Sequence, residues 1–394
     1  MSDTLQHFLG GLRPEALGAP QSGIVEVANH GRDKPGLIPL WIGEGDMPTP
    51  AFISDAATRS LAAGETFYTW QRGIPELRAA LSAYMSRLYG RPLDAERFFV
   101  TGSGMQALQI VTRIVAGAGD EVIMPTPAWP NFGAALSVAG ATPVGVPLRF
   151  GNAGWTLDLD ALAAAVTPRT RAIVINSPAN PTGWTATREE LVAILALARA
   201  RGLWLIADEI YGRFVYDEGV SRAPSFHDIM DEDDRILFVQ TFSKNWCMTG
   251  WRIGWIEAPP ALGDVIENLV QYATSGVPVF VQRAAIAALE QGEGFVAHQI
   301  ARARRGRDIV CDALAATGRA RFVKPAGAFY LFFGIAGETD ARKAAIRLVD
   351  EANVGLAPGT AFGPEGEGFF RLCFARKHED LEEASHRIAT WLAR

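Results

Sequence analysis

The sequence predicts an α/β protein with a parallel or mostly parallel sheet, joined to a smaller α+β domain. Three observations lead to this fold class. Apolar runs of strand length alternate with helix-like segments through the middle of the chain. These runs are continuously apolar, which is typical of strands buried on both faces of a parallel sheet. After about residue 290 the alternation stops, and the length of 394 residues leaves room for a second domain.

The expected elements of the first domain follow one another in a regular order. Helix-like spacing of apolar residues, closed by a glycine, fills residues 105–119 and 188–202. This alternation predicts a sheet with helices on both faces. The strand-like runs cover residues 97–102, 120–125, 171–178, 203–211 and 236–242.

The C-terminal part has a different pattern, which predicts the α+β domain. We expect the Gly/Pro-rich segment before about residue 50 to be irregular and to pack on this domain. The C-terminal pattern consists of a helix at 293–314, a strand at 327–335, a helix at 340–352, a strand at 368–375 and a last helix.

The composition argues against several classes of protein. The net charge is −6 and no long basic run occurs, so nucleic-acid binding is not expected. Three widely spaced cysteines predict neither a disulfide framework nor a metal site. The N-terminus lacks a signal-peptide pattern, and no window approaches eighteen uncharged apolar residues. We therefore expect a cytoplasmic protein that does not enter the membrane.

The stretch "VTGSGMQAL" places a glycine turn between a strand and a helix. Backbone N–H groups at such a helix start can bind an anion. The turn also fits a dinucleotide pattern with Gly102, Gly104 and Ala107, but the acidic residues Asp120 and Glu121 precede the next strand instead of ending it. A turn without a ligand and a phosphate site are both compatible with this stretch.

Two further stretches place polar residues at the ends of apolar strands. "VINSPANPTGW" contains Asn180, and "LIADEIYGRF" contains Asp208 and Tyr211. Ligands of open α/β sheets bind outside these strand ends. Each stretch by itself also fits an ordinary turn, and Asp208 also fits a helix cap. A buried aspartate at this place is able to hold a protonated ring nitrogen.

The stretch "QTFSKNWCMTGWRIGW" places Lys244 and Arg252 among aromatic and apolar residues. A lysine in an apolar pocket has a depressed pKa and attacks carbonyl groups. The fork of Arg252 suits a phosphate. The alternative is a solvated surface loop, which the flanking Phe242 and Trp246 argue against.

These separate features converge on one ligand. The glycine turn and Arg252 favour a phosphate group, and Asp208 favours a cationic ring nitrogen. Tyr211 and Asn180 suit a phenolate oxygen, and Lys244 suits an aldehyde. Pyridoxal 5'-phosphate carries all four groups, and it is usually held as a lysine Schiff base with an aspartate on its ring nitrogen.

The chain resembles the class I/II pyridoxal-phosphate-dependent aminotransferases, of the aspartate aminotransferase family and fold type I. The blocks "SPANPTGW", "ADEIY", "TFSKNWCMTGWRIGW", "PAGAFY", "APGTAFG" and "FFRLCFA" carry this resemblance, in order and over nearly the whole length. It implies a seven-stranded large domain at residues 51–290. It also implies a small domain formed by residues 1–50 and 291–394.

The resemblance implies roles for individual residues. Lys244 would form the Schiff base and move a proton between the substrate's alpha carbon and the cofactor. Asp208 would keep the ring nitrogen protonated, and Tyr211 and Asn180 would bind the ring's 3-oxygen. The phosphate would be held by Ser103, Gly104, Met105, Thr241 and Arg252, where Met105 departs from the family's small or hydroxyl residue and offers only its N–H.

The resemblance also implies substrate contacts and a partner. Arg371 would bind the substrate's carboxylate, Gly43 would add an N–H group, and Trp129 would stack on the ring. Tyr68 resembles the tyrosine that reaches the phosphate of the neighbouring subunit, which implies a homodimer with shared active sites. The alternative for Arg371 is a structural salt bridge.

The predicted activity is ping-pong transamination between an L-amino acid and a 2-oxo acid. A β-lyase acting on cysteine S-conjugates shares the same cofactor motifs and is the alternative. A non-catalytic regulator that binds pyridoxal phosphate and a nicotinamide-dependent dehydrogenase explain fewer of the motifs. No arginine for a distal carboxylate stands in "YATSGVPVF", which favours neutral amino acids. Arg72 and Arg213, near the site motifs, leave a dicarboxylate substrate open.

Overall fold

The computed structural model describes residues 7–393, and its largest element is a seven-stranded sheet. The strand order is β2-β10-β9-β8-β7-β3-β4. From β9 to β4 all neighbours are parallel, whereas β10 runs antiparallel to β9 and β2. The expectation of a mostly parallel sheet is confirmed. The strands are β2 (Phe98–Thr101), β3 (Glu121–Thr126), β4 (Thr142–Pro147), β7 (Thr170–Asn176), β8 (Trp204–Asp208), β9 (Ile236–Thr241) and β10 (Gly254–Glu257).

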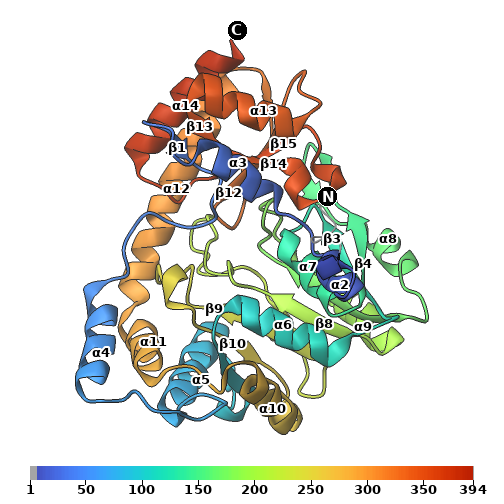
Figure 1. Cartoon of the computed structure of the whole chain (residues 1–394), viewed down its shortest axis with the longest axis vertical. Helices are drawn as coiled ribbons and strands as arrows, with labels where there is room; N and C mark the ends of the chain where they lie inside the picture. The colour runs from blue at the N-terminus through green and yellow to red at the C-terminus, as the bar shows by residue number, and fades with distance from the viewer. Residues whose placement is uncertain (1–6, 394) are drawn as a thin grey trace.

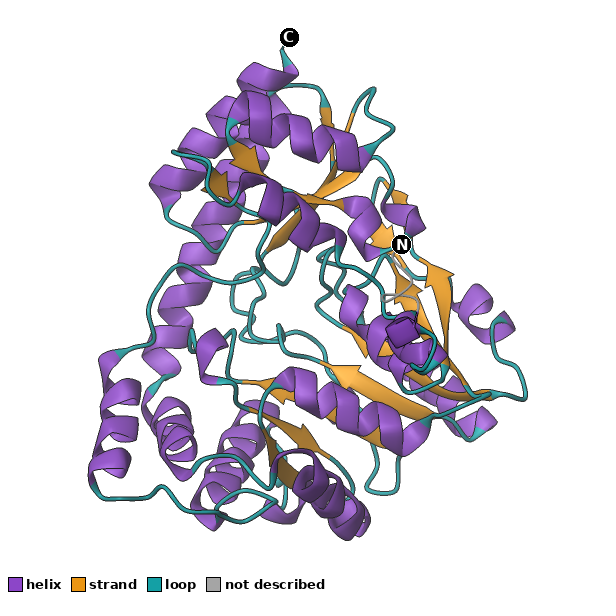
Figure 2. Ribbon diagram, in the orientation of Figure 1, coloured by secondary structure: helices purple, strands orange, loops and turns teal. Residues whose placement is uncertain are grey.

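Helices cover both faces of this sheet, which explains why its strands are continuously apolar (Figure 2). Along β7, Ile173 and Ile175 pack in one core, and Ala172 and Val174 pack in the other. On the first face lie α4 (Ala51–Ala62), α5 (Pro75–Tyr89), α8 (Leu159–Ala164), α9 (Arg188–Arg201) and α11 (Val279–Gln291). On the second lie α6 (Gly104–Val115), α7 (Pro130–Val138) and α10 (Gly263–Thr274).

The helices next to the strands begin and end where the sequence supplies caps. Thr187 and Glu190 form a capping box at the start of α9, and Gly202 ends it with φ of 64°. Ser103 caps α6, because its Oγ accepts a hydrogen bond from the N–H of Gln106. These caps fix where the chain leaves each helix for the next strand.

The C-terminal part folds around a four-stranded antiparallel sheet of order β11-β12-β15-β14. A separate hydrophobic core joins it to its helices. The long helix α12 runs from the large sheet toward this part (Figure 1). The elements are α12 (Glu293–Ala316), β11 (Ala320–Arg321), β12 (Tyr330–Ile335), α13 (Ala341–Arg347), β13 (Val354–Gly355), β14 (Ala357–Pro358), β15 (Phe369–Cys373) and α14 (His378–Leu392).

The N-terminal segment is more regular than its Gly and Pro content indicates. It contains the helices α2 (Pro14–Leu17) and α3 (Gly23–Gly31). The expectation of an irregular segment was wrong here, because Ser22 caps α3 and Val27 packs in the C-terminal core. Strand β1 (Ile38–Pro39) pairs with β13, so the segment joins the C-terminal part (Figure 1). The domain boundaries at residues 50 and 290 stay a prediction.

The strand directions bring the end of β9 and the start of β10 to one edge of the sheet. Strands β7, β8 and β9 end there at Asn176, Asp208 and Thr241. Because β10 is antiparallel, its first residue Gly254 pairs with Thr241 and with Thr101 of β2. The short strands β5 (Arg149–Gly151) and β6 (Gly154–Thr156) form a separate hairpin. Within residues 7–393, none of the helices has the length and apolarity to span a membrane.

Candidate active site

A cavity of about 430 Å³ opens at this edge of the large sheet. Of the residues singled out by the sequence, Ser103 and Tyr68 are not part of its wall, and neither are Arg72 and Arg213, which form ion pairs with Glu267 and Glu293 instead. The others line it: Gly43, Gly104, Met105, Trp129, Asn180, Asp208, Tyr211, Thr241, Lys244, Arg252 and Arg371.

Lys244 follows β9 and its amine faces the cavity. Its Nζ donates a hydrogen bond to the carbonyl of Gly43 at 2.7 Å and lies 6.0 Å from the centre of the Phe329 ring. Burial lowers the pKa of Lys244 to about 8, because the charged form loses its hydration. The neutral fraction of the amine near neutral pH is therefore larger than for an ordinary lysine, which favours attack on carbonyl groups.

Helix α12 holds the loop that carries Lys244. The side-chain amide of Gln299 donates to the carbonyls of Lys244 and Asn245 at 3.3 and 3.1 Å, and it accepts from Cys247 Sγ at 3.2 Å. Cys247 adopts φ of 51° in this loop, and burial raises the pKa of its thiol to about 11. The thiol is therefore protonated, and Cys247 serves the loop's conformation.

Asp208 is held by an asparagine that the sequence reasoning missed. Asn176 Nδ2 donates to Asp208 Oδ1 at 3.1 Å, and Asn176 Oδ1 accepts from the N–H of Asn180 at 2.8 Å. Burial raises the pKa of Asp208 to about 7, although the N–H of Ile210 bonds to the same carboxylate. A buried carboxylate of this kind is stabilised by a cation in the cavity.

Tyr211 makes a second contact that the sequence reasoning did not include. Its hydroxyl lies 2.7 Å from the hydroxyl of Tyr330, which comes from β12 and also lines the cavity. Burial raises the pKa of both phenols, so both hydroxyls are protonated. A Cβ at Gly43 would lie 2.3 Å from Tyr330 Oη, which explains why glycine stands at position 43.

The start of α6 and the end of β9 form a compact, polar corner of the cavity. A Cβ at Gly104 would lie 3.2 Å from Thr241 Cβ, so a glycine keeps the corner open. Ser103 lies behind this corner with φ of 149°, and its Oγ caps the helix. Met105 accepts a weak hydrogen bond from Asn131 through its Sδ at 3.2 Å.

Both arginines of the cavity lack a carboxylate partner within residues 7–393. Arg371 is buried, and it donates to Asn180 Oδ1 at 2.9 Å and to the carbonyl of Trp41. Its Nε has no hydrogen-bond partner in the described chain. Arg252 adopts φ of 52° and donates to the carbonyl of Thr249. The salt-bridge alternative for Arg371 is therefore not what the structure has, and both guanidinium groups are free to receive an anion.

Tyr68 lies outside the cavity with 92% of its surface exposed. Phe67, Trp70 and Tyr272 are also exposed large aromatic side chains. A Cβ at Gly276, four residues after Tyr272, would lie 3.3 Å from the carbonyl of Trp70, so these residues belong to one surface region. Exposed apolar surface gathered in this way marks an interaction surface.

Comparisons with known proteins agree over most of the chain. The family model "Aminotransferase class I and II" matches residues 36–388. An aspartate aminotransferase of Pyrococcus horikoshii is 36% identical over 355 residues, which cover 89% of this chain and 90% of the relative. The arginine–pyruvate transaminase AruH of Pseudomonas aeruginosa is 37% identical over 355 residues, 90% of this chain and 89% of the relative.

The solved structures agree with the sequence relatives. The aspartate aminotransferase of Thermotoga maritima superimposes with a TM-score of 0.91 at 32% identity, covering 97% of this chain and all of the other. The aromatic aminotransferase of Pyrococcus horikoshii has a TM-score of 0.85 at 33% identity, covering 93% and 98% of the two chains. The names of these relatives and solved structures favour transamination over the lyase alternative. The chain belongs to the class I and II aminotransferases and is a transaminase with the fold of the aspartate aminotransferases.

Proposed function

We propose that the cavity holds pyridoxal 5'-phosphate and that Lys244 forms the covalent link to its aldehyde carbon. The observation that carries this proposal is the meeting of a half-buried lysine with a lowered pKa, a buried aspartate and two arginines without a carboxylate partner in the described chain, all in one cavity. When bound, the cofactor supplies a ring that accepts the electrons released at the substrate's alpha carbon. The residues present fit each of its polar groups.

The phosphate end of the cofactor is assigned to the corner between α6 and β9. The N–H groups at the start of α6 would donate to the phosphate, and the helix dipole favours negative charge there. Arg252 adds a guanidinium that has no carboxylate partner in the described chain, and Thr241 adds a hydroxyl. Ser103 holds the helix start, and Met105 contributes its backbone N–H.

The ring end is assigned to the ends of β7 and β8. The Asp208 carboxylate would accept a hydrogen bond from the ring N–H, and that cation offsets the cost of its burial. Asn180 and Tyr211 would donate to the ring oxygen, and Trp129, which lines the same cavity, would lie beside the ring. Asn176 and Tyr330 keep Asp208 and Tyr211 in their positions.

Arg371 is assigned to the carboxylate of the amino acid. Its unpaired Nε and its two remaining donors match the geometry of a carboxylate, and Gly43 lies in the same wall. Ile24, Val25 and Ile42 line the cavity as well, and its wall contains no arginine besides Arg252 and Arg371 among the described residues. These features favour a donor with a neutral side chain.

Lys244 is also assigned the proton transfer of the reaction. With the cofactor and an amino acid bound, Lys244 Nζ would take up the proton of the substrate's alpha carbon and would return it at the end of the transfer. A pKa near 8 suits both steps, since the amine gains and loses a proton close to neutral pH.

A homodimer completes this proposal. Tyr68 is exposed in one chain and belongs to an aromatic surface region, which supports a role in the partner's site. Tyr68 of the partner subunit would then donate its hydroxyl to the phosphate. Each active site would contain residues of both chains.

An absorbance spectrum of the purified protein, followed by additions of single amino acids, tests the proposal. Loss of the visible band of the lysine-bound cofactor, with one equivalent of 2-oxo acid released and no acceptor present, is the expected result. A band that vanishes only with release of ammonia would indicate lyase chemistry. Absence of any band after addition of pyridoxal 5'-phosphate would overturn the cofactor assignment.

A further inference from the structure

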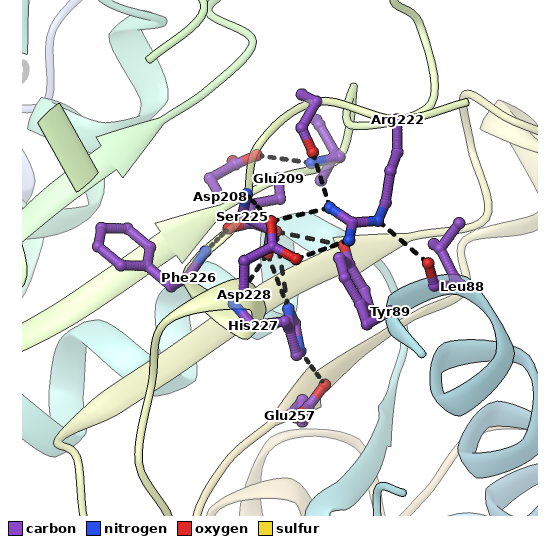
Figure 3. A network of polar contacts seen from close by, with 12 residues as sticks. Leu88, Tyr89, Asp208, Glu209, Arg222, Ser225, Phe226, His227, Asp228 and Glu257 are labelled. Atoms are coloured by element: carbon purple, nitrogen blue, oxygen red, sulfur yellow. Dashed lines mark hydrogen bonds and ion pairs between the residues drawn. The ribbon is translucent and has the colours of Figure 1, made fainter. Parts of the chain in front are cut away.

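A buried polar network lies next to the end of β8 (Figure 3), and its members Glu209, Ser225 and His227 do not line the cavity. Asp208 lines the cavity, and the next residue, Glu209, is directed into this network. Successive side chains of a strand point to opposite faces, so the two carboxylates share one strand end but face different surroundings. Glu209 is nevertheless close enough that its charge raises the pKa of Asp208, in addition to the larger effect of burial.

Every contact of the Glu209 carboxylate comes from a donor. The hydroxyl of Ser225 donates at 2.6 Å, the N–H of Phe226 at 3.2 Å and the hydroxyl of Tyr89 at 3.3 Å. An ionised carboxylate only accepts hydrogen bonds, and these contacts fit that form. Glu209 is therefore a buried negative charge beside Asp208.

His227 is the nearest imidazole, and hydrogen-bond counting gives it a positive charge. The single proton of the Ser225 hydroxyl is used on Glu209, so His227 Nδ1, 2.9 Å from Ser225 Oγ, must donate its own proton. His227 Nε2 lies 2.9 Å from a carboxylate oxygen of Glu257 and must donate as well. A histidine that donates from both nitrogens is an imidazolium.

The surroundings of His227 support this state. Its ring is stacked between those of Tyr89 and Phe238, with centroid distances of 4.0 and 3.9 Å. Burial by itself lowers the pKa of His227, but Glu257 and Glu209 outweigh it and raise the pKa to about 9.

When each cation around the network is matched with one carboxylate, His227 is the partner of Glu209. Arg222 forms an ion pair with Asp228 at 2.6 Å, and Arg97 bonds to Glu257 at 3.2 Å. Arg97 also pairs with Glu232, which is mostly exposed to solvent. His227 is then the cation that remains to balance the buried charge of Glu209.

We propose that His227 is a positioning residue for Asp208: its imidazolium neutralises Glu209 and anchors the end of β8, which favours the charged form of Asp208 and keeps its side chain directed into the cavity. The charge balance of the strand end itself does not depend on the proposed function. Only the role of a charged Asp208 as the partner of a cofactor's ring nitrogen rests on the proposed function.

The test is the pKa of Asp208 in the cofactor-free protein, measured by infrared titration of its carboxyl group. Difference spectra against Asp208→Asn identify the band. In His227→Gln the charge of Glu209 is uncompensated, and the pKa of Asp208 should rise by about one unit, a tenfold change in proton affinity. In Glu209→Gln the pKa should fall. The double variant should return close to the wild-type value, since it removes both charges.

Opposite shifts in the two single variants, with recovery in the double variant, support a charge-balancing role. The proposal would be overturned if the pKa of Asp208 shifted in neither single variant, or by the same amount in the single and double variants. His227 would then be a packing residue. Urea unfolding of each variant identifies loss of fold. If His227→Gln does not fold, Glu209→Gln alone decides, and an unchanged Asp208 pKa overturns the proposal.

The proposed function is tested separately on the same proteins by fluorescence titration with pyridoxal 5'-phosphate. If the wild type does not bind the cofactor, the proposed function fails whatever the Asp208 pKa does. If the wild type binds the cofactor and neither substitution changes the pKa of Asp208, only the inference about His227 fails.

Discussion

At the scale of single residues, the site consists of charged groups placed where burial changes their chemistry. Lys244 has its pKa lowered to about 8 and Asp208 has its pKa raised to about 7, both chiefly because their charged forms lose hydration. Arg371 is buried without a carboxylate partner in the described chain, so an arriving anion supplies the missing contact. Each of these groups is costly in a cavity that never receives a ligand.

Replacement of Lys244 tests the residue with the most direct chemical role. Lys244→Ala should lower turnover by about 10²–10⁴-fold through loss of proton transfer alone, and further through loss of the covalent link. Phosphate-dependent binding of the cofactor should persist, because Arg252 and the start of α6 are unchanged. Steady-state kinetics and a binding titration measure the two effects. Lys343→Ala, at an exposed lysine of α13, serves as the control, and full activity of Lys244→Ala would refute the assignment.

Replacement of Arg371 tests the carboxylate contact. Arg371→Lys keeps the charge but loses the two-pronged geometry, so kcat/KM for the amino donor should fall by about thirtyfold, which corresponds to about 2 kcal/mol. The affinity for pyridoxal 5'-phosphate should stay at the wild-type value. An equal loss of cofactor affinity would show instead that Arg371 supports the cavity as a whole.

At the scale of elements, the antiparallel strand β10 is what brings Arg252 to the cavity. The loop after β9 reverses the chain, and Gly254 of β10 then lies between β9 and β2, opposite Thr241 and Thr101. A Cβ at Gly254 would lie 2.6 Å from the carbonyl of Gln240 and 2.7 Å from the N–H of Gly104. The start of α6 and the start of β10 thus touch through their backbones, which requires a glycine.

From this backbone contact we predict the effect of adding one methyl group at position 254. Gly254→Ala should lower the free energy of unfolding by about 1–3 kcal/mol, since both neighbours are backbone atoms that cannot rotate away. It should also weaken phosphate binding, because the start of α6 moves. Gly250→Ala is the matched control, as no atom lies within 4 Å of its added Cβ. Urea denaturation compares them, and equal stability of the two variants would argue against a rigid contact.

At the scale of the whole molecule, two features lie outside the cavity. The exposed aromatic region around Tyr68 and Tyr272 fits an interface with a second copy. The buried His227 network links η2 (Phe226–Asp228) with β8, β10 and α5, and it makes the stability of the fold depend on pH.

The dimer is tested by placing a charge in the aromatic region. Trp70→Asp should shift the protein from dimer to monomer mass in analytical ultracentrifugation, because a carboxylate would have to be desolvated in the interface. Activity should fall as well, because under the proposed dimer Tyr68 of the partner subunit would no longer reach the site. Val323→Asp, at another exposed apolar residue, should change neither property. A wild-type protein that is monomeric and fully active would contradict the shared site.

The pH dependence of stability follows from His227. Its pKa is raised in the folded protein to about 9, above the ordinary value of 6.5, so folding is favoured while the imidazole is protonated. This contribution, about 3 kcal/mol, is fully present below about pH 6.5 and is lost as the pH rises through 9. Urea midpoints of the wild type and His227→Gln should therefore differ at pH 6 and converge near pH 10. A constant difference would mean that His227 is uncharged in the fold.

The sequence by itself determined the alternation of strands and helices, the mostly parallel sheet and the polar residues that end its strands. These features follow from local rules, since burial on both faces requires apolar strands and helix caps require particular residues. It could not identify Tyr330 as a site residue, because its contact with Tyr211 joins segments that are distant along the chain. The position of Asn176 at the end of β7, like that of Asp208 at the end of β8, is a pattern from which the sequence could have predicted a site residue.

Tertiary structure alone decided the rest. The pairing of Glu209 with His227, the clamp of Gln299 on the Lys244 loop and the unpaired state of Arg371 all depend on which side chains meet across the fold. Residue type gives a group its chemistry, but its charge state depends on the burial and neighbours that packing provides. The sequence therefore contains the reacting groups, and the fold decides which of them are charged, neutralised or free to bind.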